Sequence, residues 1–216
     1  MKKIILFGDS IRLGYQNFVK ESFEGVATVS FPSSNGAFMQ NMLRYLNIWK
    51  VEENLPENAD VVHWNAGAWD VLRIMGDDTL TSPEYYGELI VRVHKRITEL
   101  FPNAVQIFAT TTNGVEELYS PPYQRYNSDV VKFNEIAIKK LIPLGVKIND
   151  LYGITKDLPK DSSCRSDLTH FSTVDGIKLL GGQVVKSICL ALNIKLEELK
   201  NVNVTVQNFS KQLQRE

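Results

Sequence analysis

The chain has 216 residues, of which 44% are hydrophobic and 23% are charged. A chain of this length forms one domain, or one domain with an appendage, and can bury a sizeable core. Its 24 Lys and Arg residues nearly balance its 25 Asp and Glu residues, for a formal net charge of −1. This balance argues against nucleic acid or an anionic membrane surface as a partner.

The sequence also carries no pattern of export or membrane insertion. Two cysteines, Cys164 and Cys189, are too few for a disulfide framework. The apolar run at residues 4–7 stops at Gly8, too early for a secretion signal. No stretch approaches the roughly 18 apolar residues of a membrane span. We therefore expect a cytoplasmic protein.

Short apolar runs alternate with longer amphipathic stretches along the chain. In order, the pattern predicts strand 3–7, helix 11–21, strand 26–31, helix 37–51, strand 60–65, helix 83–101, strand 105–110, helix 128–144, strand 146–148 and helix 173–192. Gly145 is expected to cap the fourth of these helices. Strands alternating with helices indicate right-handed βαβ units, so we predict a flavodoxin-like three-layer α/β/α sandwich with a five-stranded parallel sheet.

Residues 1–194 are expected to form this domain, and residues 195–216 a polar C-terminal extension, which we predict to be helical. Its composition (KLEELKNVNVTVQNFSKQLQRE) is compatible with a packed accessory helix, a contact between copies of the chain in a homo-oligomer, or a frayed tail. The sequence does not decide among the three.

Three predicted loops lie where ligands bind in a parallel sheet, beyond the carboxyl ends of the strands. They are residues 8–10 (GDS), residues 32–36 (PSSNG) and residues 65–70 (NAGAWD). Each combines glycine with small polar side chains, as expected where backbone approaches a substrate. Ser10 is also a good N-cap for the helix that follows it, and this role is compatible with a catalytic one.

The chain has three histidines, and one of them lies in a polar loop. His63 falls inside a predicted strand and is expected to be a buried core residue, whereas His94 is expected on the flank of a helix. His170 follows Asp167 by three residues in an irregular segment before the last helix. An aspartate at this spacing can accept a hydrogen bond from the imidazole and fix its tautomer, as the third member of a catalytic triad does.

Four segments together resemble the GDSL, or SGNH, hydrolase family. They are residues 7–14 (FGDSIRLG), 32–36 (PSSNG), 65–70 (NAGAWD) and 167–170 (DLTH), in the order of the family's first, second, third and fifth blocks. The segments lie on predicted loops and span nearly the whole chain. The resemblance implies a serine nucleophile, a catalytic histidine and aspartate, and no metal or organic cofactor.

The resemblance also implies individual roles. Ser10 would be the nucleophile, His170 the general base and then the general acid, and Asp167 the residue that orients the imidazole. The backbone N–H groups of Ser10 and Gly36 would donate to the oxyanion.

The third block departs from the family pattern. Trp69 stands where the family has its oxyanion-hole asparagine, directly before Asp70. An indole has a single N–H donor on a bulkier frame, so Asn65 is an alternative source of this donor. Asp9, Asn35, Trp69 and Asp70 are further candidates for substrate contacts.

Other chemistries have weaker support in the sequence. Cys164, Asp167 and His170 lie close together, but a fourth zinc ligand is not evident. The glycine-rich phosphate-binding patterns are missing. Trp64, Trp69, Tyr85 and Tyr86 could form an aromatic wall for a sugar or acyl chain, or could simply pack in the core.

We therefore predict a serine esterase that acts on a small-molecule carboxylic ester, with O-acetyl groups on a carbohydrate as the preferred substrate. The alternative is a catalytically weak or inactive module of the same fold that binds a glycan or a protein. The replacement of asparagine by Trp69 motivates this alternative.

Overall fold

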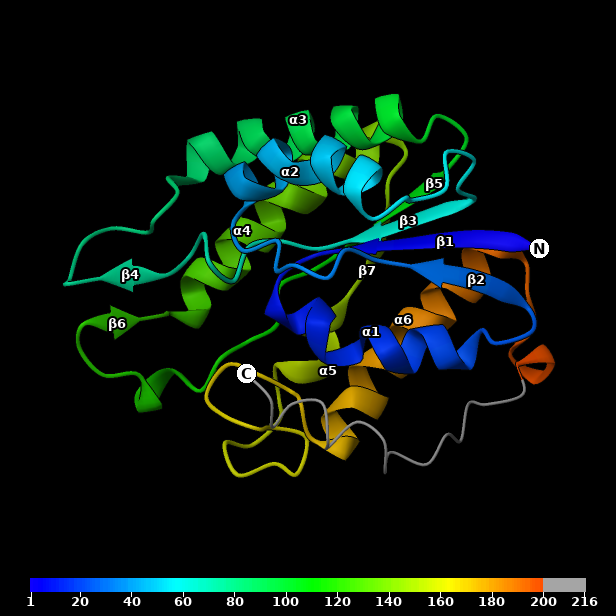
Figure 1. Ribbon diagram of the computed structural model, residues 1–216. Helices are drawn as coiled ribbons and strands as arrows, with labels where there is room; N and C mark the ends of the chain where they lie inside the picture. Colours follow the sequence, from blue (N-terminus) through cyan, green and yellow to red (C-terminus); the bar gives the residue numbers. More distant parts are fainter. Residues whose placement is uncertain (200–216) are drawn as a thin grey trace.

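A five-stranded parallel sheet forms the centre of the molecule (Figure 1), in the strand order β2-β1-β3-β5-β7. In this computed structural model, which describes residues 1–199, the strands are β1 (Lys2–Phe7), β2 (Ala27–Ser30), β3 (Val61–Trp64), β5 (Val105–Ala109) and β7 (Lys147–Asn149). Every neighbouring pair is parallel. The predicted sandwich with its five parallel strands is confirmed.

Helices cover both faces of the sheet (Figure 1). One layer contains α2 (Met39–Glu52), α3 (Pro83–Leu100) and α4 (Asn127–Leu141), and the other contains α1 (Ser10–Ser22), α5 (Leu151–Thr155) and α6 (Val174–Leu192). Along β1, Ile5 and Phe7 pack under the first layer, whereas Ile4 and Leu6 pack under the second. This alternation explains why the strand is apolar at every position from Ile4 to Phe7, because both faces of the sheet are buried there.

The ends of several elements differ from the predictions. Helix α1 begins at Ser10 and is capped by Asp9, whose carboxylate accepts a hydrogen bond from the Ile11 N–H (3.0 Å), so the prediction that Ser10 is the N-cap is wrong. Helix α2 begins at Met39, because Ala37 has a positive φ of 49° and cannot be helical. Gly145 does cap the fourth helical segment, in the left-handed conformation that glycine tolerates.

A two-stranded arm also forms within regions that were predicted to be loops. Strand β4 (Arg73–Ile74) pairs with the antiparallel strand β6 (Tyr123–Gln124). Arg73 joins the arm to α4 through an ion pair with Asp129 (2.8 Å). In Figure 1 the arm projects from the body of the domain beyond α4.

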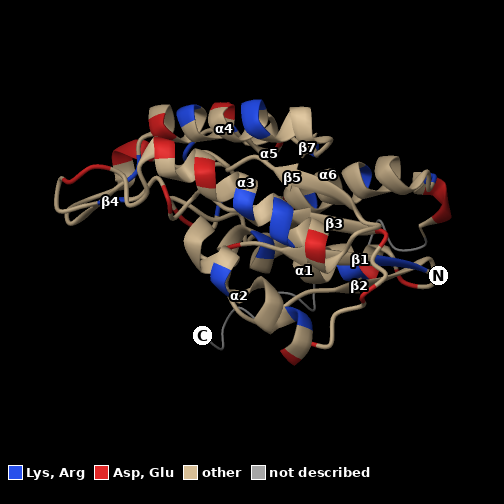
Figure 2. Cartoon of the chain, turned by 90° about the horizontal axis from the view of Figure 1, so that it is seen from above, with Lys and Arg blue, Asp and Glu red and all other residues tan. Residues whose placement is uncertain are grey.

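Charged residues of both signs are distributed over the surface helices, and both α3 and α4 carry basic and acidic residues (Figure 2). None of the helices in the described residues is long and apolar enough to cross a membrane.

At the end of the described chain, Leu196–Glu198 form a 3₁₀ turn, and Leu199 packs in the core beneath α1 and α6. The helix predicted for the C-terminal extension, and the oligomer contact considered for it, fall mainly on residues 200–216, which lie outside the described residues.

Candidate active site

The carboxyl ends of β1 and β3 form the centre of the site. In the sheet, β2 lies on one side of β1 and β3 lies on the other. The connections that leave the adjacent ends of β1 and β3 therefore run in opposite directions along the sheet. Ligands bind at such a switch point in open α/β sheets. Gly8, Asp9 and Ser10 follow β1, and Asn65 follows β3.

Ser10 lies at the first position of α1, at the surface end of a buried turn. Asp9 beneath it is buried and binds the Ile11 N–H and the Asn65 side-chain amide (2.8 Å). Burial raises the pKa of Asp9, although its hydrogen bonds with Asn65 and Ile11 and the positive charge of Arg125 oppose the rise. Asp9 therefore holds the serine turn in place and does not face a substrate.

Close backbone contacts explain the glycines of the two loops. A Cβ on Gly8 would collide with the side-chain oxygen of Asn65, and a Cβ on Gly36 would lie 2.6 Å from the Gly8 carbonyl oxygen. The Gly36 N–H instead donates to that carbonyl oxygen at 2.9 Å. The second loop is thereby fixed directly against the serine turn.

Arg12, two residues after Ser10, is a second connection between these loops and was not among the predicted site residues. Its side chain is fully buried and donates to the carbonyl oxygens of Gly8 (3.2 Å), Pro32 (2.9 Å) and Ser34 (2.6 Å). Burial lowers the pKa of Arg12 to about 10. An arginine in the first turn after a candidate nucleophile is the only signal in the sequence, whereas its burial, which requires such partners, is seen only in the structure.

His170 lies in the loop before α6, directly opposite Ser10. Its Nε2 is 2.8 Å from Ser10 Oγ, and its Nδ1 is 2.8 Å from Asp167 Oδ2. The other carboxylate oxygen of Asp167 accepts the backbone N–H groups of Thr169 (2.6 Å) and His170 (2.7 Å). Partial burial raises the pKa of Asp167, but these hydrogen bonds outweigh it, and the pKa lies below the ordinary value.

An ionised Asp167 determines which nitrogen of His170 carries the proton. A carboxylate can only accept hydrogen bonds, so Nδ1 must be the donor of this contact. In the neutral ring Nε2 is then unprotonated and can accept the hydroxyl proton of Ser10. This is the arrangement that a general base needs to activate a serine.

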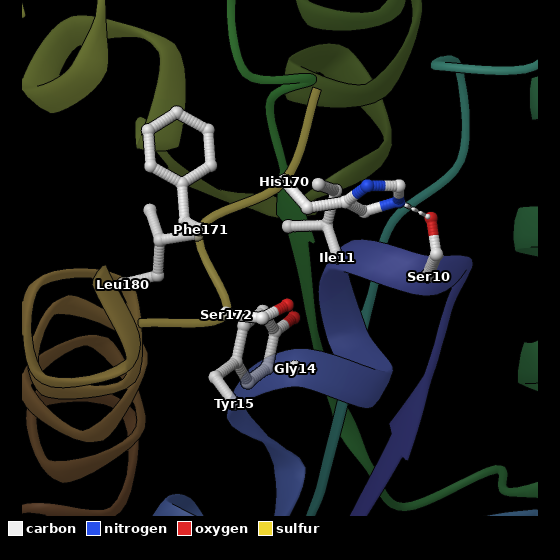
Figure 3. Close-up of a pocket in the computed structure, with 8 residues that line it drawn as sticks. All are labelled: Ser10, Ile11, Gly14, Tyr15, His170, Phe171, Ser172 and Leu180. Carbon is white, nitrogen blue, oxygen red and sulfur yellow. Dashed lines mark hydrogen bonds between the residues drawn. The ribbon is translucent and has the colours of Figure 1, made fainter. Parts of the chain in front are cut away.

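The loop that carries His170 is anchored in the core. Phe171 is buried against Leu180 of α6, while the His170 imidazole extends to the N-terminus of α1, as Figure 3 shows. Ser10, Gly14, His170 and Phe171 are among the residues that line a narrow crevice here. One-third of the His170 side chain is exposed (34%), so the histidine is accessible although its backbone is fixed.

Three donors were predicted for the oxyanion hole, and the structure gives each a different environment. As the first residue of α1, Ser10 has a backbone N–H without an intrahelical acceptor. The Gly36 N–H is bonded to Gly8, so it can serve an oxyanion only by sharing or leaving that bond. Asn65 donates one amide proton to Asp9 and has a second available.

The remaining candidates for substrate contacts divide into scaffold and surface. Asn35 accepts the N–H of Ala37 at 2.8 Å and so closes its own loop. Asp70 is fully buried and binds the Thr81 hydroxyl (2.8 Å) and the N–H of Met39 (3.1 Å) at the start of α2. Trp69 alone of the set lines an open pocket, next to Leu168. Asn35 and Asp70 therefore shape the site without facing it.

The burial of Asp70 makes stability depend on pH. Burial raises its pKa to about 6 from 3.8, so the folded protein binds this proton more tightly than the unfolded chain. The stability that the group contributes is present below about pH 4 and is lost as the pH rises through 6. We expect Asp70→Asn to gain roughly 3 kcal/mol in unfolding free energy, relative to wild type, between pH 4 and 7.5.

Urea denaturation at several pH values measures this difference, and Asp77→Asn is the control because Asp77 is exposed. A constant difference between Asp70→Asn and wild type across the range would contradict the assignment.

The other two histidines lie away from the site. His63 is fully buried in β3 and contacts Asn149 (3.0 Å), and burial lowers its pKa to about 3. His94 is half-buried on α3 and contacts Gln106 (3.1 Å). Among the aromatic candidates, Trp64 and Tyr86 are core residues, and Tyr85 lines a separate pocket between α2 and α3.

No family model and no curated protein sequence matches the chain. Solved structures do match. A lipase/acylhydrolase from Enterococcus faecalis is 22% identical, with a TM-score of 0.66 over 93% of this chain and 98% of that one. A putative acylhydrolase from Bacteroides fragilis NCTC 9343 is 14% identical, with a TM-score of 0.68 over 88% of each chain. The acetyl xylan esterase AlAXEase is 17% identical, with a TM-score of 0.63 over 86% of this chain and 99% of that one.

Proposed function

We propose that this chain, which has the fold of the GDSL-like lipases and acylhydrolases, is a serine esterase for small carboxylic esters. The observation that carries the proposal is the relay from Ser10 Oγ to His170 Nε2 and from His170 Nδ1 to Asp167, with both contacts at 2.8 Å. Residues 160 positions apart in the chain meet at hydrogen-bond distance with the nucleophile at a helix N-terminus. This combination is the geometry of acyl transfer through a covalent intermediate.

In the proposed mechanism His170 accepts the proton of Ser10 as Oγ attacks the ester carbonyl carbon. The oxyanion that forms is stabilised by the Ser10 N–H and by the positive end of the α1 dipole, with Gly36 and Asn65 as further donors. His170 then protonates the leaving alcohol. Water, activated by the same histidine, releases the acid and restores the serine.

We propose an acetyl group on a carbohydrate as the natural ester. The closely packed seam between α1 and the His170 loop offers no channel for a fatty acyl chain, which is compatible with a short acyl group. The likeness to an acetyl xylan esterase supports the same choice. The cytoplasmic location expected from the sequence stays a prediction.

Hydrolysis assays test the function and the acyl preference together. We expect turnover of p-nitrophenyl acetate, with kcat/KM falling as the acyl chain lengthens from acetate to octanoate, and release of acetate from acetylated oligosaccharides. If octanoate were preferred to acetate, the small-acyl assignment would be wrong. If no ester were hydrolysed, the esterase itself would be rejected in favour of a binding module.

Asn65→Ala tests the third oxyanion donor. If the free amide proton of Asn65 acts on the oxyanion, kcat should fall by about 10²–10³ while KM changes little. The substitution also removes a donor from buried Asp9, which should cost about 1–3 kcal/mol of unfolding free energy. Thermal denaturation separates the two effects. Wild-type kinetics in a destabilised variant would leave Asn65 as a purely structural support.

A further inference from the structure

A pocket of about 370 Å³ opens beside the His170 loop, at the base of the β4–β6 arm. Its apolar wall includes Trp69, Leu72, Leu118 and Leu168, and its polar residues include Tyr119 and Arg125. Leu168 is two residues before His170, so the pocket reaches the loop that carries the histidine, although His170 does not line it. Trp69, the residue that replaces the family asparagine, is therefore part of this wall.

Arg125 is the only cation that lines this pocket, and no carboxylate within residues 1–199 lies in ion-pair distance of it. Its Nη1 donates to the hydroxyls of Tyr119 (3.1 Å) and Thr169 (3.0 Å), both of which are neutral. Its Nε is buried without a hydrogen-bond acceptor among the described residues. Arg73, on the neighbouring strand, is instead paired with both Asp129 and Asp78.

Of the nearby acidic residues, Asp9 interacts electrostatically with Arg125, but none within residues 1–199 forms an ion pair with it. Glu116 directs its carboxylate to the N–H of Asn127 at 2.7 Å. Asp167 is fully used by His170 and the backbone N–H groups beside it. A second guanidinium, that of Arg165, stacks over Phe171 and bonds to the neutral Asn113, which adds to the positive potential around the loop.

We propose that this pocket binds the alcohol part of the substrate, and that this part is a sugar or aromatic ring bearing a carboxylate that pairs with Arg125. The assignment rests on the proposed esterase function. The leaving alcohol takes its proton from His170, and the pocket opens against the loop that carries this histidine, so we place the alcohol there. Trp69 and Tyr119 both offer aromatic surface to a ring, and a carboxylate matches a guanidinium that has donors to spare.

A matched pair of acetyl esters tests the charge preference: 4-acetoxybenzoate and its methyl ester. We expect wild-type kcat/KM to be about tenfold higher for the anionic ester, which is the ratio that a hydrogen-bonded ion pair supports. This ratio should decline in high salt, because salt screens the attraction between the charges. Arg125→Gln should bring the ratio close to one, and Arg125→Lys should retain part of it. Arg92→Gln, which removes an exposed charge on α3, is the matched control and should keep the wild-type ratio.

Because Arg125 also contacts Thr169 next to His170, its loss could disturb the histidine. Such a disturbance would lower both rates together and leave their ratio unchanged, so the ratio isolates the charge effect. A wild-type ratio of one or less, or an unchanged ratio in Arg125→Gln, would overturn the proposal. If the enzyme preferred a carboxylate only on the acyl part, with p-nitrophenyl hemisuccinate hydrolysed faster than its methyl ester, the placement of the alcohol would be overturned.

Calorimetric titration of Ser10→Ala with the same two benzoate esters separates this inference from the proposed function. Suppose that Ser10→Ala binds 4-acetoxybenzoate more tightly than its methyl ester, and that the added substitution Arg125→Gln removes this difference. This result supports the pocket even if the wild-type chain hydrolyses nothing. Turnover without any charge preference in rates or binding supports the esterase and rejects the pocket assignment. Absence of both turnover and binding rejects both.

Discussion

Ser10→Ala is expected to lower kcat for p-nitrophenyl acetate by a factor on the order of 10⁵. The hydroxyl is the only nucleophile that the proposed mechanism places against His170 Nε2, at 2.8 Å. Removing the nucleophile of a serine hydrolase typically lowers kcat by a factor of about this size. The residual rate comes from the oxyanion donors and from substrate binding. KM should change far less than kcat, because the hydroxyl acts in the chemical step and the smaller alanine side chain does not obstruct substrate binding.

The control for Ser10→Ala is its stability. Asp9, and not Ser10, caps α1, so loss of the hydroxyl should leave the unfolding free energy within about 0.5 kcal/mol of wild type. Steady-state kinetics and urea denaturation measure the two quantities. A residual rate within tenfold of wild type in a folded variant would show that another group attacks the ester.

His170→Ala is expected to lower kcat by a factor comparable to that of Ser10→Ala. Without the imidazole, the Ser10 hydroxyl has no base, and the leaving alcohol has no acid. Because the two residues act as a unit, the double variant Ser10→Ala/His170→Ala should be no slower than either single variant. Kinetics of the three variants give this cycle directly.

The fold should survive the loss of His170. The loop is anchored through buried Phe171 and through backbone hydrogen bonds to Asp167, which alanine at position 170 retains. Cooperative unfolding near the wild-type midpoint is therefore expected. Loss of cooperativity would mean that His170 has a structural role, and additive losses in the double variant would contradict a shared step.

The sequence predicted the sheet and its longer helices, although not the short helix α5, because the signals involved are local. Apolar runs such as residues 3–7 and the periodicity of residues 83–101 are set by burial of a face, and they need no knowledge of distant contacts. The spacing of Asp167 and His170 is also local: the aspartate accepts two N–H groups from the turn that it begins and still reaches the imidazole.

The N-cap error is local, because Asp9 next to Ser10 takes that role, but the other features that were missed depend on distant residues. Asp70 supplies a carboxylate to the start of α2 from 31 residues away, and Asn65 binds Asp9 across 56 positions. The β4–β6 pair is too short to leave a periodic signal. Arg125, which directly follows β6, donates a hydrogen bond to Thr169, 44 positions away in the chain. Neither the buried carboxylates nor the pocket beside the histidine could be read from neighbouring residues alone.

Covalent labelling of the nucleophile tests the central claim most directly. The intact chain would be incubated with a fluorophosphonate, and the modified residue located by peptide mass spectrometry, with Ser10→Ala and His170→Ala as controls. We predict a single phosphonyl adduct on Ser10 in the wild-type chain, no adduct in Ser10→Ala, and slow labelling in His170→Ala, because the hydroxyl needs its base. An unlabelled wild-type chain, or an adduct on another residue, would contradict the assignment of Ser10 as the nucleophile.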